Sequence, residues 1–115
     1  VDDMKTNLQM LRGILEPLYD VILMKSGHQA LLYLKKHPAP DLVLMDIDMP
    51  EMDGIETAKR IMEMTDHTVP ILFVTALCDR QTVTLDAAGY IVRPYKPVFV
   101  KTEIKRILMG RSEIE

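Results

Sequence analysis

The chain has 115 residues, the length of one small domain, and 48% of them are hydrophobic, which is enough for a buried core. Its net charge of -3 gives no general attraction to nucleic acid or anionic membranes, so we expect no direct nucleic acid binding. One cysteine excludes a disulfide framework and a cysteine-based zinc site, and fits a reduced, cytoplasmic setting. No apolar run approaches membrane-spanning length, so no membrane segment is expected.

Several segments have the periodicity of amphipathic helices. They are expected at residues 5–15, from Ser26 to just before Pro38, at 54–64 and at 98–109, with a shorter helical segment after Asp79. Ser26 and Gln29 form a capping box at the start of the second helix. Asp3 or Thr6 is expected to cap the first.

Short apolar runs lie between these helices. They predict strands at residues 20–24, 42–45, 71–74 and 90–92. The run at 42–45 does not alternate with polar residues, which is typical of a strand buried on both faces. The regular alternation predicts right-handed crossovers and a doubly wound α/β domain, a parallel sheet with helices on both faces. We expect this domain to cover 1–110, and 111–115 to be a C-terminal tail or the start of a linker.

Three carboxylates are predicted to meet at one edge of the sheet. Asp46 ends the central apolar run, at the end of the strand where open α/β sheets bind their ligands. If Val1 ends a neighbouring strand, Asp2 and Asp3 present their carboxylates at the same edge. Carboxylates this close favour a shared cation, and oxygen ligands suit Mg²⁺. A carboxylate can also attack phosphorus and form an aspartyl phosphate.

Two further features would complete such a site. Thr75 follows the next apolar run and offers a hydroxyl group. Arg93, or alternatively Lys96, follows the last strand and offers a cation. Both kinds of group bind phosphoryl oxygens.

Four motifs together resemble the receiver domain of two-component response regulators. They are Val1-Asp2-Asp3, the stretch from Leu42 through Asp46 to Met49-Pro50-Glu51-Met52-Asp53-Gly54, Val74-Thr75-Ala76, and Gly89-Tyr90-Ile91-Val92-Arg93-Pro94-Tyr95. The resemblance covers nearly the whole chain. It implies a five-stranded parallel sheet of flavodoxin-like order 2-1-3-4-5. It also implies a signalling switch that receives a phosphoryl group from a sensor histidine kinase or a phosphotransfer protein.

The resemblance also assigns roles to residues. Asp46 corresponds to the phosphoacceptor, and the only enzymatic activity implied is self-catalysed phosphoryl transfer and acyl-phosphate hydrolysis. The implied Mg²⁺ ligands are Asp2, Asp3, Asp46 and the backbone carbonyl of Asp48. Thr75 and Tyr90 correspond to the switch pair. They would alter the face formed by the fourth helix, fifth strand and fifth helix, which is also the expected homodimer surface.

Three features depart from the family pattern. Arg93 replaces the family's lysine, and a planar guanidinium does not simply substitute for an ammonium. Lys96 is the runner-up for that contact, and Arg93–Pro94 is the candidate cis peptide. The segment from Thr75 to Arg93 is about one helical turn short, so the fourth helix is stunted or residues are missing from it. No apolar run precedes Val1, so we expect the first strand to be largely absent from the sequence or supplied by another chain.

Two alternatives stay open at this point. The arginine and the short segment would suit a receiver-like interaction module that works without phosphorylation. More remotely, Asp46-x-Asp48 matches the nucleophile and acid of haloacid dehalogenase-type phosphatases, although those enzymes are longer. Ordinary packing explains the presence of Tyr90 nearly as well as a switch role does. A role in a turn explains Asp48 about as well as contact with the metal does.

Overall fold

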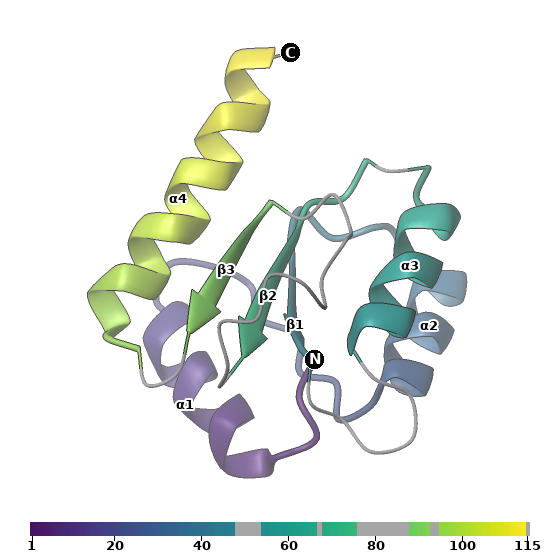
Figure 1. Cartoon of the computed structure of the whole chain (residues 1–115), viewed down its shortest axis with the longest axis horizontal. Coiled ribbons are helices and arrows are strands. Elements are labelled where there is room, and N and C mark those ends of the chain that lie inside the picture. The colour runs from purple at the N-terminus through teal and green to yellow at the C-terminus, as the bar shows by residue number, and fades with distance from the viewer. Residues whose placement is uncertain (48–53, 67, 76–87, 93–94, 115) are drawn as a thin grey trace.

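The computed structural model describes residues 1–47, 54–66, 68–75, 88–92 and 95–114. The helices are α1 (Lys5–Leu15), α2 (Gly27–Lys36), α3 (Gly54–Met64) and α4 (Pro97–Ile114). The strands are β1 (Val43–Asp46), β2 (Ile71–Thr75) and β3 (Gly89–Val92). Helices α2 and α3 cover one face of the sheet, and α1 and α4 lie on the other (Figure 1).

The described sheet has three parallel strands in the order β1-β2-β3. Val43 pairs with Ile71 and Asp46 with Val74, so β1 and β2 end at the same edge. Thr75 pairs with Val92, and β3 therefore ends there too. This arrangement follows from the crossovers, because each helix returns the chain to the start of the next parallel strand.

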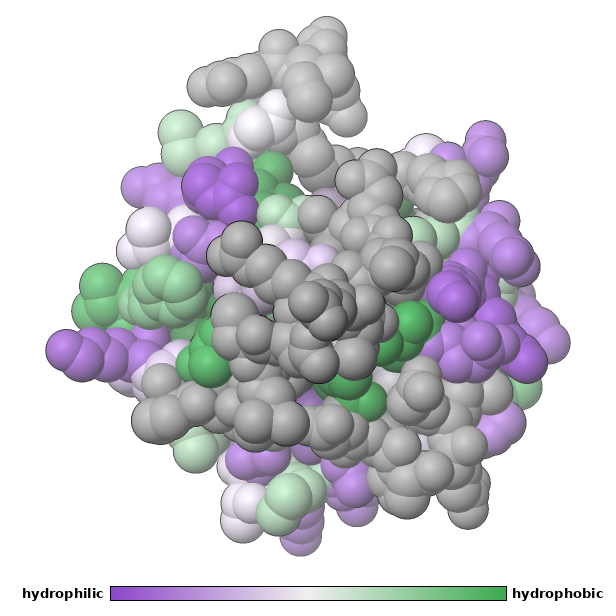
Figure 2. Space-filling view, in the orientation of Figure 1, coloured by the Kyte–Doolittle hydropathy of each residue, from purple (hydrophilic) through white to green (hydrophobic). Residues whose placement is uncertain are grey.

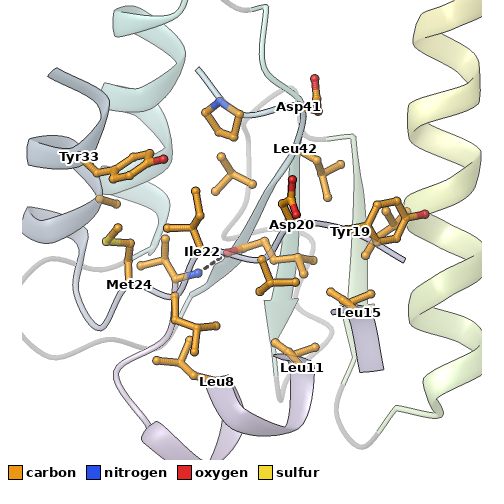
Figure 3. Close-up of a pocket in the computed structure, with 18 of the residues that line it drawn as sticks. Leu8, Leu11, Leu15, Tyr19, Asp20, Ile22, Met24, Tyr33, Asp41 and Leu42 are labelled. Carbon is orange, nitrogen blue, oxygen red and sulfur yellow. Dashed lines mark hydrogen bonds between the residues drawn. The ribbon is translucent and has the colours of Figure 1, made fainter. Parts of the chain in front are cut away.

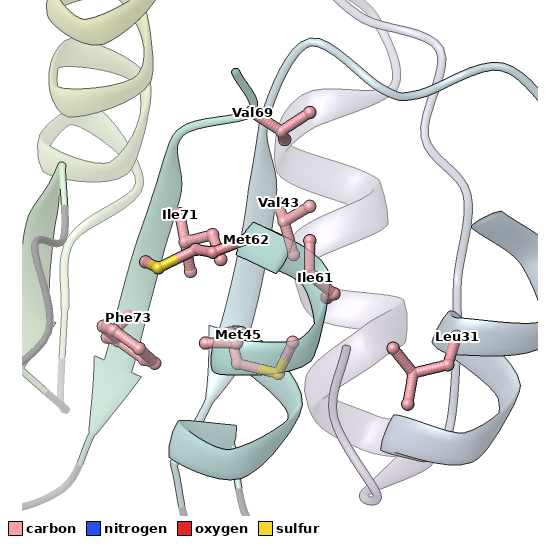
Figure 4. Packing of buried hydrophobic residues seen from close by; sticks show 9 residues of the cluster. Leu31, Val43, Met45, Ile61, Met62, Val69, Ile71 and Phe73 are labelled. Carbon is pink, nitrogen blue, oxygen red and sulfur yellow. The ribbon is translucent and has the colours of Figure 1, made fainter. Parts of the chain in front are cut away.

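Each face of the sheet carries its own apolar core. The core under α2 and α3, shown in Figure 4, contains Leu31, Val43, Met45, Ala58, Ile61, Met62, Val69, Ile71 and Phe73. The core under α1 and α4 contains Leu11, Leu15, Leu72, Val74, Ile91, Val100, Ile104 and Ile107. Consecutive residues of β2 alternate between the two clusters, because successive side chains of a strand point to opposite faces. All of Ile71 to Val74 are thus buried. In the run at 42–45, for which burial on both faces was predicted, Val43 and Met45 are buried and Leu42 and Leu44 are partly buried.

Most predicted elements are confirmed. Helices α1 and α3 have the predicted bounds, and α2 begins after the Ser26 N-cap, whose hydroxyl accepts the Gln29 N–H at 3.1 Å. The predicted cap of α1 is wrong, because Met4 is its N-cap and no side chain caps it. The last helix is longer than predicted, running from Pro97 to Ile114. The helical segment expected after Asp79 lies outside the described residues.

The strand predicted at residues 20–24 is not formed. A strand needs a hydrogen-bonded neighbour, and the backbone bond found for this segment is from the Asp2 N–H to the Met24 carbonyl, at 3.0 Å. The five-strand order is therefore not seen among the described residues, although the doubly wound parallel α/β architecture is.

Candidate functional site

The amino-terminal residues extend the sheet beside the end of β1. The Val1 amino group donates to the Leu44 carbonyl at 2.6 Å, and the Asp46 N–H donates to the Val1 carbonyl at 3.0 Å. This is the hydrogen-bond pattern of a parallel strand pair, with Val1 opposite Met45. Asp2 therefore follows Val1 at the same edge at which Asp46 follows Met45.

Three carboxylates converge there. One oxygen each from Asp2, Asp3 and Asp46 lie within 4.8 Å of one another. Asp2 and Asp46 are only 2% and 3% exposed, whereas Asp3 is open to solvent. The Met4 N–H donates to Oδ1 of Asp2 at 2.9 Å and fixes that carboxylate. The convergence predicted from the alternation of elements is thus present.

Burial and the acidic cluster change the pKa of the Val1 amino group in opposite directions. Burial lowers the pKa of this amine from its usual 8.0 to about 6, while the negative charges of Asp2 and Asp46 act in the opposite direction. The lowering of the pKa by loss of hydration is the larger effect, because the amino group is buried beside the sheet. The carboxylates nonetheless favour positive charge at this edge.

The donor set suits a hard divalent cation. Mg²⁺ prefers carboxylate oxygens at about 2.0–2.1 Å, so ligands on opposite sides of the ion lie about 4.2 Å apart. Adjacent ligands of an octahedral ion lie only about 2.9 Å apart, so the three oxygens, now within 4.8 Å of one another, would draw closer together around a shared ion. Two of the three carboxylates are buried, and a cation would offset the cost of holding them close together.

Gly54 keeps the start of α3 against this site. Its N–H donates to the Ile47 carbonyl at 3.1 Å. A Cβ at Gly54 would collide with the carbonyl oxygen of Asp46 and would lie 2.8 Å from the Cα of Ile47. No described glycine has a positive φ, so glycine is needed here for close approach rather than for an unusual turn. Sequence reasoning missed this contact.

Thr75 ends β2, next to β1, and Tyr90 lies one strand further, on β3. The backbone of Thr75 lies one residue beyond Val74, the partner of Asp46. The Tyr90 ring stacks on Phe73, with centroids 6.0 Å apart and 19° between the ring planes, and is partly buried.

Of the two candidate cations, Lys96 lies away from the acidic cluster and Arg93 lies outside the described residues. Lys96 is exposed just before α4 and lines a shallow hollow with Tyr90, Val92 and Phe99. It is not part of the described acidic cluster. Asp48, Arg93 and the Arg93–Pro94 bond lie outside the described residues.

The sequence matches known proteins along most of its length. The family profile described as response regulator receiver domain matches residues 1–105. The chain belongs to this receiver family. The match also favours a receiver over the phosphatase alternative, since the profile covers both the acidic amino terminus and the Asp46 motif.

Curated relatives of this receiver domain are longer regulators. It is 34% identical over 119 residues to the alkaline phosphatase synthesis transcriptional regulatory protein PhoP of Bacillus subtilis, covering 99% of this chain and 48% of that protein. It is 35% identical over 100 residues to the probable transcriptional regulator ycf27 of Pyropia yezoensis, covering 84% of this chain and 40% of that protein. The receiver domain thus spans less than half of each relative.

A solved structure agrees with the fold. The signal receiver domain of a signal transduction histidine kinase from Syntrophus aciditrophicus is 31% identical, with a TM-score of 0.85, over 96% of this chain and 87% of that one. These relatives support a role in two-component signalling, and receiver domains of this family are generally not enzymes. Across the described residues, no helix has both the length and the hydrophobicity to cross a bilayer.

Proposed function

We propose that this receiver domain accepts a phosphoryl group on Asp46 from a sensor histidine kinase or a phosphotransfer protein. The observation that carries the proposal is the convergence of Asp2, Asp3 and Asp46 at the end of β1. These residues, together with the backbone carbonyl of Asp48, would hold Mg²⁺. The bound ion would neutralise charge on the phosphoryl oxygens during transfer.

In this transfer a carboxylate oxygen of Asp46 attacks the phosphorus of a donor phosphohistidine. The new O–P bond forms as the P–N bond breaks, and the histidine nitrogen keeps the electron pair. The backbone of Asp46 is fixed by its bond to Val1 and by its contact with Gly54, so the nucleophile is held in place before the donor arrives. Arg93, with Lys96 as runner-up, would bind the phosphoryl oxygens together with Thr75.

Phosphorylation would then alter an output face. Thr75 would move toward the new phosphoryl group, and Tyr90 would fill the space that it leaves. The face beyond Tyr90 carries exposed apolar side chains beside Lys96: Val92, Val98 and Phe99 are all exposed, Val98 by 73%. Figure 2 shows hydrophobic residues gathered over the start of α4. This face suits a partner protein or a second receiver domain.

The test is the mass of the intact protein after incubation with acetyl phosphate and Mg²⁺. We expect one added phosphoryl group in the wild type and none in Asp46→Asn. The matched control is Asp20→Asn, an exposed carboxylate outside the cluster, which should be phosphorylated like the wild type. Addition to Asp46→Asn at the wild-type level would refute the assignment.

A second candidate is a receiver that works without phosphorylation. The observation in its favour is Arg93 at the position of the family's lysine. Such a domain would keep the same fold and dock constitutively through the face at the start of α4. A folded wild-type protein that gains no phosphoryl mass would favour this candidate over the first.

A further inference from the structure

The start of α2 packs against α3 with no room for a side chain between them. A Cβ at Gly27, the first residue of α2, would collide with Oγ1 of Thr57 and would lie 3.2 Å from the Cβ and Cγ2 of that residue. Thr57 is 0% exposed on α3. A β-branched side chain is stiff about χ1, so in this buried position it cannot turn out of the way. Any side chain at position 27 would therefore push the two helices apart.

The first turn of α2 is fixed by its capping box. The Ser26 hydroxyl accepts the Gln29 N–H at 3.1 Å, and the Gln29 side chain accepts the Lys25 N–H at 3.0 Å. These two bonds satisfy backbone donors at the start of the helix and hold the residues around Gly27 in one arrangement. A change in the contact with α3 is thus not absorbed by rearranging the start of α2.

The residues that lead into α2 are tied to the acidic edge of the sheet. The Met24 carbonyl accepts the N–H of Asp2 at 3.0 Å, three residues before α2 begins. The Met24 side chain points into the same pocket as Tyr33 of α2 (Figure 3). The start of α2 therefore has a fixed position relative to one of the three clustered carboxylates.

Helix α3 connects this contact to Asp46. Gly54 begins α3 and meets the backbone of Asp46, whereas Thr57, three residues later, meets the start of α2. Three residues are nearly one helical turn, so the two contacts belong to the same end of α3. The Asp46 N–H bonds to Val1, which precedes Asp2. The contacts thus form a closed ring from Asp46 through α3 and the start of α2 to Asp2.

We propose that Gly27 and Thr57 are positioning residues for Asp46, because their contact sets how closely α3 approaches the end of β1. A wider gap between α2 and α3 would draw Gly54 away from the Asp46 backbone and leave the carboxylate less fixed. A misplacement of about 1 Å slows a reaction by as much as about a hundredfold. The effect on reaction rate rests on the proposed phosphorylation of Asp46, whereas the effect on α3 does not.

The first measurement is hydrogen exchange of the Gly54 amide, which bonds to the Ile47 carbonyl. Gly27→Ala should speed this exchange at least about fivefold, and by more than exchange of the Leu72 amide in the buried central strand. Thr57→Ala removes Oγ1 and Cγ2. The double variant should therefore exchange at Gly54 within about threefold of Thr57→Ala alone.

The second measurement is the rate of phosphoryl mass gain of the folded chain with acetyl phosphate and Mg²⁺. Gly27→Ala should slow it at least about tenfold, and the double variant should recover most of the rate. Two controls should keep the wild-type rate and should not speed exchange at Gly54 more than at Leu72. Gly13→Ala adds a methyl group with nothing within 4 Å, and Ile104→Val loosens the core under α1 and α4.

Three results would overturn the proposal. Gly27→Ala could speed exchange at Gly54 no more than at Leu72. Thr57→Ala could fail to relieve the effect of Gly27→Ala. Exchange at Gly54 could speed while phosphorylation keeps the wild-type rate. A wild type that gains no phosphoryl mass refutes the proposed function instead, and the exchange measurement then still decides whether Gly27 and Thr57 hold α3 in place.

Discussion

Asp46 and Gly54 are in contact through their backbones, and this contact sets the geometry of the site at the residue scale. The carbonyl of Asp46 lies where any side chain at Gly54 would begin. The start of α3 can therefore pack directly against the end of β1. Asp46 is thereby held from one side by this helix and from the other by Val1.

Gly54→Ala should consequently separate α3 from β1. The added methyl group meets backbone atoms, which cannot rotate away, so we expect a loss of about 1–3 kcal/mol in the free energy of unfolding. Phosphorylation of Asp46 should slow as well. Urea unfolding and the rate of phosphoryl mass gain measure the two effects.

Gly13→Ala is the matched control. Gly13 lies within α1, is exposed, and has nothing within 4 Å of the position a Cβ would take. Alanine should stabilise the helix there by about 0.5–1 kcal/mol. If both substitutions change stability in the same direction, the close approach at Gly54 is not the cause.

The sequence predicted the meeting of Asp2, Asp3 and Asp46 but not the contact at Gly54. Alternating strands and helices force parallel strands to end at one edge, so residues that follow those strands must come together. The space around Gly54 depends on how closely α3 approaches β1. The residues next to Gly54 in the sequence do not indicate how close that approach is.

At the scale of elements, the helices were predicted better than the strands. The periodicity of α1 and α3 and the capping box of α2 are local signals. The segment 20–24 has equally good strand composition, yet it forms no ladder. Strand formation depends on a hydrogen-bonded partner elsewhere in the chain, which local composition does not indicate.

The cap of α2 gives a test at this scale. The Ser26 hydroxyl accepts the Gln29 N–H, and the Gln29 side chain accepts the Lys25 N–H at 3.0 Å. Ser26→Ala should lower the free energy of unfolding by about 0.5–2 kcal/mol, measured by urea unfolding. Thr6→Ala should cost nothing, since Thr6 is exposed within α1 and Met4 is the N-cap. A larger loss for Thr6→Ala than for Ser26→Ala would contradict these cap assignments.

At the scale of the whole molecule, the sheet separates two apolar cores and places the three clustered carboxylates at one of its edges. The acidic cluster lies at the end of β1, and an apolar surface lies at the start of α4. Tyr90, stacked on Phe73, lies on β3 and lines the hollow that Phe99 of α4 also borders. Under the proposed function, Tyr90 would connect a change at Asp46 to this exposed surface.

Mg²⁺ titration by calorimetry tests the central claim most directly, that the three carboxylates form one cation site. Asp3 is exposed, so Asp3→Asn should fold normally, and Asp66→Asn removes an exposed carboxylate elsewhere. The account predicts one Mg²⁺ per chain for the wild type and for Asp66→Asn, and an affinity at least about tenfold lower for Asp3→Asn. Equal affinities for all three proteins, or no Mg²⁺ binding by the folded wild type, would contradict it.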